Sequence, residues 1–92
     1  MSVIEGRLKE LGLELPEAVA PLYSYVPVKI HQGAAYVSGQ VPRVDGEIPS
    51  PGKVGSDVTV EQAQELAEIC VLKGLSSLKA AIGDLDNIVE VL

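Results

Sequence analysis

The stretch that decides the fold lies between Tyr25 and Pro42 and reads YVPVKIHQGAAYVSGQVP. Apolar and polar side chains alternate along residues 25–31, which is the period of a strand with one buried face. Residues 32–33, Gln-Gly, are a turn candidate, and residues 34–39 predict a second strand, so an antiparallel hairpin is expected. The first strand should carry Val26, Val28 and Ile30 on one face and Tyr25, Lys29 and His31 on the other.

Proline and glycine mark the irregular parts of the chain. Pro27 removes one hydrogen-bond donor from the first predicted strand, so we expect it at an edge, a bulge or a bend. Residues 40–57 hold three prolines and three glycines and predict a long loop. Within it, Asp45-Gly46 has the composition of a tight turn, and residues 47–49 could form a short strand. A loop of this length often belongs to a site or an interface.

A short helix is predicted before the hairpin, over residues 3–11. Ser2 can cap it, and Glu5 stands three residues further on, where a capping box requires its partner. Gly12 is placed to end this helix. Residues 13–21 contain two prolines and are expected to form an extended connector.

A long helix is predicted after the loop. Thr59 can cap it with Gln62 as the reciprocal partner, and Gly83 should end it after about 23 residues. Helical spacing places Ala63, Leu66, Ala67, Cys70, Val71, Gly74, Leu78 and Ile82 on an apolar face. The opposite, solvated face carries Glu61, Gln64, Glu65, Glu68 and Lys79. Residues 88–92, IVEVL, then have the composition of a strand.

The order of these elements predicts an α+β fold in which a long helix packs on one face of a sheet. Ninety-two residues are enough for one domain. A helix of this length usually covers four or more strands, so we expect residues 1–92 to form a single domain that is incomplete at its C-terminus. Apolar residues on the strands should then cause the chain to associate.

Composition and charge restrict the classes of function. The net charge of −6 and the scattered positions of the seven basic residues argue against nucleic-acid binding. Cys70 is the only cysteine and has no His or second Cys at metal-ligand spacing, so neither a disulfide, a metal nor a cofactor is expected. The N-terminus lacks the pattern of a signal peptide, and no apolar segment is long enough to span a membrane. A cytoplasmic protein is predicted.

The order of these motifs resembles the YjgF/RidA family, also catalogued as endoribonuclease L-PSP. The characteristic strand end of that family corresponds here to residues 37–42, VSGQVP, and Tyr25 lies thirteen residues before Ser38, as in the family. The stretch at 57–63 and the helix-to-strand junction at 78–89 agree with the same pattern. The N-terminal LKELGLELP resembles the members with a longer N-terminal segment. The resemblance covers nearly all of this chain and about two-thirds of a usual family domain.

The resemblance implies a chorismate-mutase-like fold: a mixed sheet with two helices on one face, in trimers with ligand pockets between subunits. Active members hydrolyse enamines and imines to 2-keto acids and ammonia. A backbone N–H at the position of Gly39 and an arginine from the C-terminal half bind the substrate carboxylate, a tyrosine matching Tyr25 lines the pocket, and a glutamate positions water. The arginine and glutamate positions lie beyond Leu92, so this chain can supply only part of such a pocket.

Four residues are therefore candidates for ligand binding: Tyr25, Ser38, Gly39 and Gln40. No catalytic residue is assigned. Gly39 would let a carboxylate approach the backbone closely, although a bulge or close strand packing would also explain a glycine there. Ser38 could instead bond the local backbone, and Gln40 could stabilise the turn before Pro42. His31 is expected to be solvated, and Cys70 to act as a small apolar residue.

Three functions remain open at this point. The first is an enamine or imine deaminase. The second is a non-catalytic trimer that binds a small carboxylic metabolite. The third, ribonuclease or translation-inhibitor activity, is the least favoured, because the chain is acidic and has no catalytic His pair or metal cluster.

Overall fold

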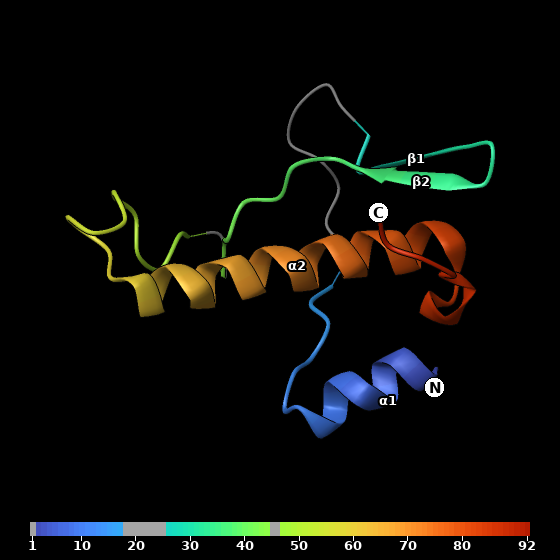
Figure 1. Ribbon diagram of the computed structural model, residues 1–92, viewed down its shortest axis with the longest axis horizontal. Helices are drawn as coiled ribbons and strands as arrows, with labels where there is room; N and C mark the ends of the chain where they lie inside the picture. The colour runs from blue at the N-terminus through green and yellow to red at the C-terminus, as the bar shows by residue number, and fades with distance from the viewer. Residues whose placement is uncertain (1, 18–25, 45–46) are drawn as a thin grey trace.

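The computed structural model describes residues 2–17, 26–44 and 47–92. Its elements are the helix α1 (Val3–Glu10), the strands β1 (Val28–His31) and β2 (Ala34–Val37), the helix α2 (Val60–Ile82) and the 3-10 helix η1 (Leu85–Asn87). Helix α2 runs across the molecule, with the hairpin on one side and α1 on the other (Figure 1). It contacts β1, β2 and η1. The predicted α+β class, with the long helix on one sheet face, is confirmed.

The hairpin forms at the predicted turn. β1 and β2 pair antiparallel, with Val28 opposite Val37 and His31 opposite Ala34. Gln32 and Gly33 both have positive φ, 49° and 78°. This is the backbone of a type I′ turn, whose twist matches that of the flanking strands.

Both strands are shorter than predicted, because Pro27 stands at the open end of the hairpin. It lies in a bend directly before β1, which agrees with one of the positions expected for it. The N–H of Ser38 still donates to the carbonyl of Pro27, at 3.0 Å. Proline has no N–H to return, so the regular ladder stops at Val28 and Val37.

Helix α2 has the predicted boundaries. The Thr59 hydroxyl accepts from the N–H of Gln62 at 3.1 Å, and the Gln62 side chain accepts from the N–H of Thr59 at 2.9 Å, which completes the capping box. The helix runs for 23 residues and ends at Gly83. The predicted cap, length and end are confirmed.

Three residues of α2 differ from the prediction, and Ser76, which was assigned to neither face, makes a contact that was not predicted. Ala67 and Val71, assigned to the apolar face, are exposed, and Val71 keeps 61% of its surface. Lys79, assigned to the solvated face, forms an ion pair with Glu5. Ser76 is buried and donates to the carbonyl of Pro16. The reason is that the two-stranded hairpin covers only part of α2, while the N-terminal segment lies against another part of it.

Helix α1 begins and ends close to the predicted residues. The Ser2 hydroxyl accepts from the N–H of Glu5 at 3.0 Å. At the other end, the N–H groups of Gly12 and Leu13 donate to Lys9 and Leu8 at 3.0 and 2.9 Å, the pair of bonds that defines a Schellman motif. α1 has no fully buried residue. Its position therefore depends on polar contacts with the rest of the chain more than on a packed apolar face.

The loop between the hairpin and α2 is more irregular than predicted. The expected short strand at 47–49 is a single bridge between Val44 and Glu47. The predicted turn at Asp45-Gly46 lies outside the described residues. Further along, the N–H of Lys53 donates to the Asp57 carboxylate at 3.1 Å, and Val58 is almost fully buried. These contacts lie directly before Thr59, the residue that caps α2.

The predicted strand at residues 88–92 is wrong for this structure. After η1 the chain has no regular structure, and Val89 and Val91 remain 99% and 86% exposed. A strand needs a neighbour that satisfies its backbone groups, and no described segment pairs with these residues. The sheet of the described residues is thus a two-stranded antiparallel hairpin, without a parallel strand.

The buried core of the described residues is small. Val58 and Leu85 are its buried apolar side chains, and Leu85 is completely covered. Val26, which precedes the hairpin, and Ile30 and Tyr36, which lie on it, each keep more than half of their surface, at 60%, 51% and 61%. So much exposed apolar surface on a short chain leaves little burial to stabilise it alone.

Candidate functional site

The segment that follows β2 carries three of the four candidate residues. Ser38 donates its hydroxyl to the carbonyl of Pro27 at 3.2 Å, beside the backbone bond to the same oxygen. That carbonyl therefore receives two hydrogen bonds from one residue. In this arrangement the Ser38 hydroxyl closes the open end of the hairpin, with its proton directed toward the backbone.

Gly39 is the most open of these residues. It is exposed, and a Cβ placed on it would have no described heavy atom within 4 Å. The N–H of Ser38 donates to the carbonyl of Pro27, whereas the N–H of Gly39 has no acceptor among the described residues. This N–H is a donor that an external carboxylate could reach.

Gln40 holds the segment in a fixed shape. Its side-chain amide donates to the carbonyl of Ser38 at 3.0 Å, across the intervening Gly39. Its own carbonyl accepts a weak hydrogen bond from the Cys70 thiol, with the sulfur at 3.6 Å. Gln40 is half-buried between the segment and α2. This geometry agrees with a supporting role for Gln40, whereas the Gly39 N–H is a donor without an acceptor in the described part of the chain.

One turn of α2 contacts the segment that follows β2. The sequence analysis did not predict this contact. Lys73 donates from Nζ to the carbonyl of Val41 at 3.0 Å. A Cβ at Gly74 would lie 3.8 Å from Gln40 Cγ and from Val37 Cγ1, so the helix approaches the segment closely there. A glycine inside a helix costs stability relative to alanine, and this was the sequence signal for a close packing contact. No feature of the sequence indicated that Lys73 would contact this segment.

Three other residues were considered in the sequence: Tyr25, His31 and Cys70. Tyr25 falls outside the described residues, so the structure does not place it relative to Gly39. His31 is exposed next to the hairpin turn, as expected. Cys70 is half-buried against the segment after Gly39. Ser38, Gly39 and Gln40 are therefore close to one another because they are consecutive in the chain.

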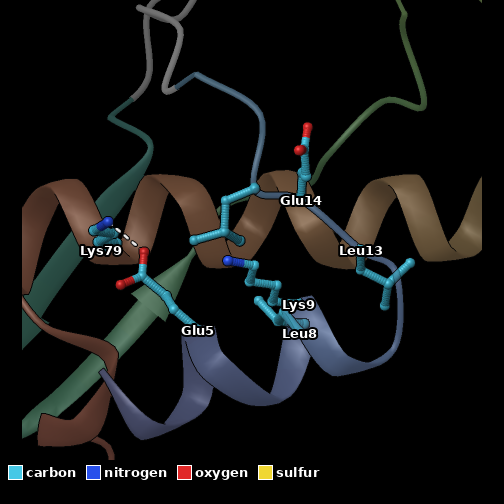
Figure 2. Close-up of a pocket in the computed structure, with 7 residues that line it drawn as sticks. Glu5, Leu8, Lys9, Leu13, Glu14 and Lys79 are labelled. Carbon is cyan, nitrogen blue, oxygen red and sulfur yellow. Dashed lines mark hydrogen bonds and ion pairs between the residues drawn. The ribbon is translucent and has the colours of Figure 1, made fainter. Parts of the chain in front are cut away.

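A separate groove lies between α1 and α2 (Figure 2). It has a volume of about 630 Å³ and is lined by Glu5, Leu8, Lys9, Leu13, Glu14, Leu15 and Lys79. The carboxylate of Glu5 accepts from Lys79 Nζ at its edge, while the Lys9 side chain extends into the space between the helices. The hydrogen bond from Lys79 lowers the pKa of Glu5, against a smaller opposing effect of desolvation. Of the sequence-predicted site residues that the structure describes, Ser38, Gly39 and Gln40, none lines this groove.

Two further features bear on the class of site. Within residues 2–17, 26–44 and 47–92, no three or more side chains of His, Cys, Asp or Glu gather in a way that could hold a metal ion. Of the helices in the same residues, none has the length and apolar character to cross a bilayer.

Comparison with known proteins identifies the family. Residues 5–92 match the family model described as "YjgF/chorismate mutase-like, putative endoribonuclease". The match extends over nearly the whole chain, including the hairpin, the Ser38–Gln40 segment and α2. The chain belongs to the YjgF family, and its fold is of the chorismate-mutase-like type. The resemblance based on the sequence is confirmed.

Individual relatives agree with this assignment. Protein TCP17 of Trypanosoma cruzi is 36% identical over 89 residues, which cover 97% of this chain and 56% of that protein. The crystal structure of a protein from Shewanella oneidensis MR-1, described as a "putative endoribonuclease", aligns with a TM-score of 0.84 and 35% identity over 92% of this chain and 56% of its own. Atu1372 from Agrobacterium tumefaciens, of unknown function, aligns with a TM-score of 0.76 and 50% identity over 90% of this chain and 49% of its own. The chain spans about half the length of these relatives.

Proposed function

We propose that this chain contributes one half of a ligand pocket for a small carboxylic metabolite and takes part in the hydrolysis of enamines or imines to 2-keto acids and ammonia. The observation that carries the proposal is the exposed Gly39, whose N–H has no acceptor among the described residues and whose missing side chain leaves the approach open. A backbone donor of this kind suits a carboxylate oxygen, because a charge-assisted hydrogen bond is stronger than a neutral one.

The pocket is proposed to be completed by another part of the assembly. A carboxylate held only by one N–H lacks a cationic partner, and an arginine would supply two parallel donors. The outer face of the hairpin, with Lys29, His31 and Tyr36, is exposed and could meet a second copy of the chain. In this proposal the pocket lies between subunits of a homotrimer, in the cytoplasm, where the lone Cys70 stays reduced.

Nuclear magnetic resonance tests the pocket first. Titration of the ¹⁵N-labelled chain with 2-ketobutyrate should shift the Gly39 amide signal more than the amides of α1. Gly39→Ala should weaken the binding, because the added Cβ narrows the approach. Gly6→Ala is the matched control, since a Cβ at Gly6 also meets nothing within 4 Å. An unperturbed Gly39 signal at saturating ligand would overturn the pocket.

Pyruvate release from enzymatically generated 2-aminoacrylate tests the reaction. Acceleration over solvent hydrolysis, with a loss of rate in Gly39→Ala, would support the deaminase. Binding without acceleration would leave the second candidate, a non-catalytic binder of carboxylic metabolites. Ribonuclease activity is the third candidate, and it is the least favoured because the net charge of −6 opposes RNA binding. Cleavage of an RNA substrate by the pure chain would reverse this order.

A further inference from the structure

The segment that carries Gly39 is held from one side by a single turn of α2. Lys73 Nζ donates to the carbonyl of Val41, and the Cys70 thiol donates to the carbonyl of Gln40. Gly74 lies close to these contacts, with Gln40 Cγ and Val37 Cγ1 at 3.8 Å from the position of its missing Cβ. Two successive backbone carbonyls after Gly39 are therefore bonded to the same helical turn.

The bond from Lys73 acts at a residue with little conformational freedom. Val41 precedes Pro42, which restricts Val41 to an extended backbone. On the other side of the segment, the Gln40 side chain donates to the carbonyl of Ser38. The backbone on both sides of Gly39 is thus restrained, at Ser38 and at Val41. The Gly39 N–H lies in the same peptide plane as the Ser38 carbonyl, so its rotation would break the bond from Gln40, while the bond from Lys73 restrains the other end of the segment.

Lys73 is the strongest of the three contacts from α2. An ammonium donating to a carbonyl is a charge-assisted hydrogen bond, whereas the bond from the Cys70 thiol is weak. Neither of the two ion pairs among the described residues involves Lys73. Its ammonium is therefore directed to the Val41 carbonyl without competition from a described carboxylate.

We infer that Lys73 is a positioning residue, which orients the Gly39 N–H toward the ligand carboxylate through the Val41 carbonyl. The inference rests on the proposed function, because it assigns Lys73 a role in that same pocket. A donor fixed before the ligand arrives improves affinity, since less conformational freedom is lost on binding. The ligand class is the one proposed above, a small 2-keto acid or its enamine precursor.

The test compares three variants in the full 92-residue chain. Lys73→Met keeps the length of the apolar stem and removes the donors, Lys73→Arg restores a charged donor, and Lys53→Met removes a lysine whose ammonium has no partner among the described residues. Loss of this bond should weaken 2-ketobutyrate binding by roughly five- to tenfold in Lys73→Met. Lys73→Arg should recover most of the affinity, and Lys53→Met should bind like the parent. The melting temperature of each variant, measured in parallel, separates positioning from unfolding.

Amide hydrogen exchange tests the role of Lys73 in the absence of a ligand. Exchange at Ser38 and Arg43, whose N–H groups donate to the carbonyls of Pro27 and Val41, should be faster in Lys73→Met, while exchange in α1 stays the same. If the parent chain does not bind 2-ketobutyrate but this change in exchange occurs, the proposed pocket fails and Lys73 still positions the segment. Unchanged exchange and unchanged affinity in a folded Lys73→Met would overturn the inference.

Discussion

The carboxylate of Asp86 accepts hydrogen bonds from the N–H of Val3 at 2.8 Å and from the neighbouring N–H of Ile4 at 3.0 Å. The first N–H groups of a helix have no partner within the helix, and its N-terminus attracts negative charge. Residues 83 positions apart thus meet at the start of α1. Among the described residues, the N-terminal segment makes two further polar contacts with the rest of the chain, those of Glu5 with Lys79 and of Pro16 with Ser76.

Removing the Asp86 carboxylate should release the start of α1. Asp86→Ala leaves two N–H groups without their acceptor, and loss of a helix-capping side chain costs about 1 kcal/mol. Hydrogen exchange should therefore increase in α1 and remain slow in the middle of α2. Glu90→Ala is a control, because Glu90 is exposed and takes part in neither of the two ion pairs among the described residues. Equal exchange in Asp86→Ala and the parent would show that α1 is held by other contacts.

The pair of Glu5 and Lys79 should make stability depend on acid pH. The pKa of Glu5 is lower in the folded chain than its ordinary value of 4.5, mainly because of the hydrogen bond from Lys79. A lowered carboxyl pKa gives stabilisation that is fully present above the unfolded pKa and is lost as the pH falls through the folded pKa. Thermal unfolding between pH 7 and pH 3 should show Glu5→Gln less stable than the parent at neutral pH, with the difference shrinking in acid.

A matched carboxyl variant separates this effect from general acid unfolding. Glu10 pairs with Arg7 on the same helix, but both side chains are about 70% exposed. Exposed ion pairs of this kind contribute little. Glu10→Gln should therefore follow the stability of the parent across the whole pH range. An equal loss of stability in Glu5→Gln and Glu10→Gln would mean that the contact of Glu5 with Lys79 contributes no specific stabilisation.

Substitutions at Gly74 test how closely α2 packs against residues 38–41. Alanine places its Cβ 3.8 Å from Gln40 and Val37, an ordinary contact distance, and it suits a helix better than glycine by about 0.5–1 kcal/mol. Gly74→Ala should raise the melting temperature. Gly74→Leu should instead push Gln40 away and change the amide signals of residues 38–41. An equally stable, unshifted Gly74→Leu would contradict the close approach of α2 to this segment.

The capping box of α2 gives a further stability test. Thr59→Ala removes the acceptor for the N–H of Gln62 and should destabilise the chain by about 1 kcal/mol. Thr59→Ser keeps the hydroxyl and should restore most of this loss. Chemical denaturation monitored by circular dichroism at 222 nm provides the measurement. If both variants unfolded at the same denaturant concentration, the cap would not contribute.

Local features were predictable from the sequence because their causes lie within a few residues. The turn at Gln32-Gly33 and the cap formed by Thr59 and Gln62 both depend on backbone preferences and hydrogen bonds between near neighbours. The VSGQVP motif likewise indicated the family, because a short run of consecutive residues carries that signal. The position of Tyr25 relative to the pocket stays a prediction, since that residue lies outside the described ones.

By itself the sequence determined the hairpin, the two helices with their caps, and the family, because each depends on short-range patterns. The tertiary structure alone decided which distant groups meet: Glu5 with Lys79, Asp86 with the start of α1, and Lys73 with Val41. It also decided that residues 88–92 form no strand, since strand composition cannot supply the neighbour that completes its hydrogen bonds. Such contacts depend on how the elements pack in space, and that packing leaves no local pattern along the chain.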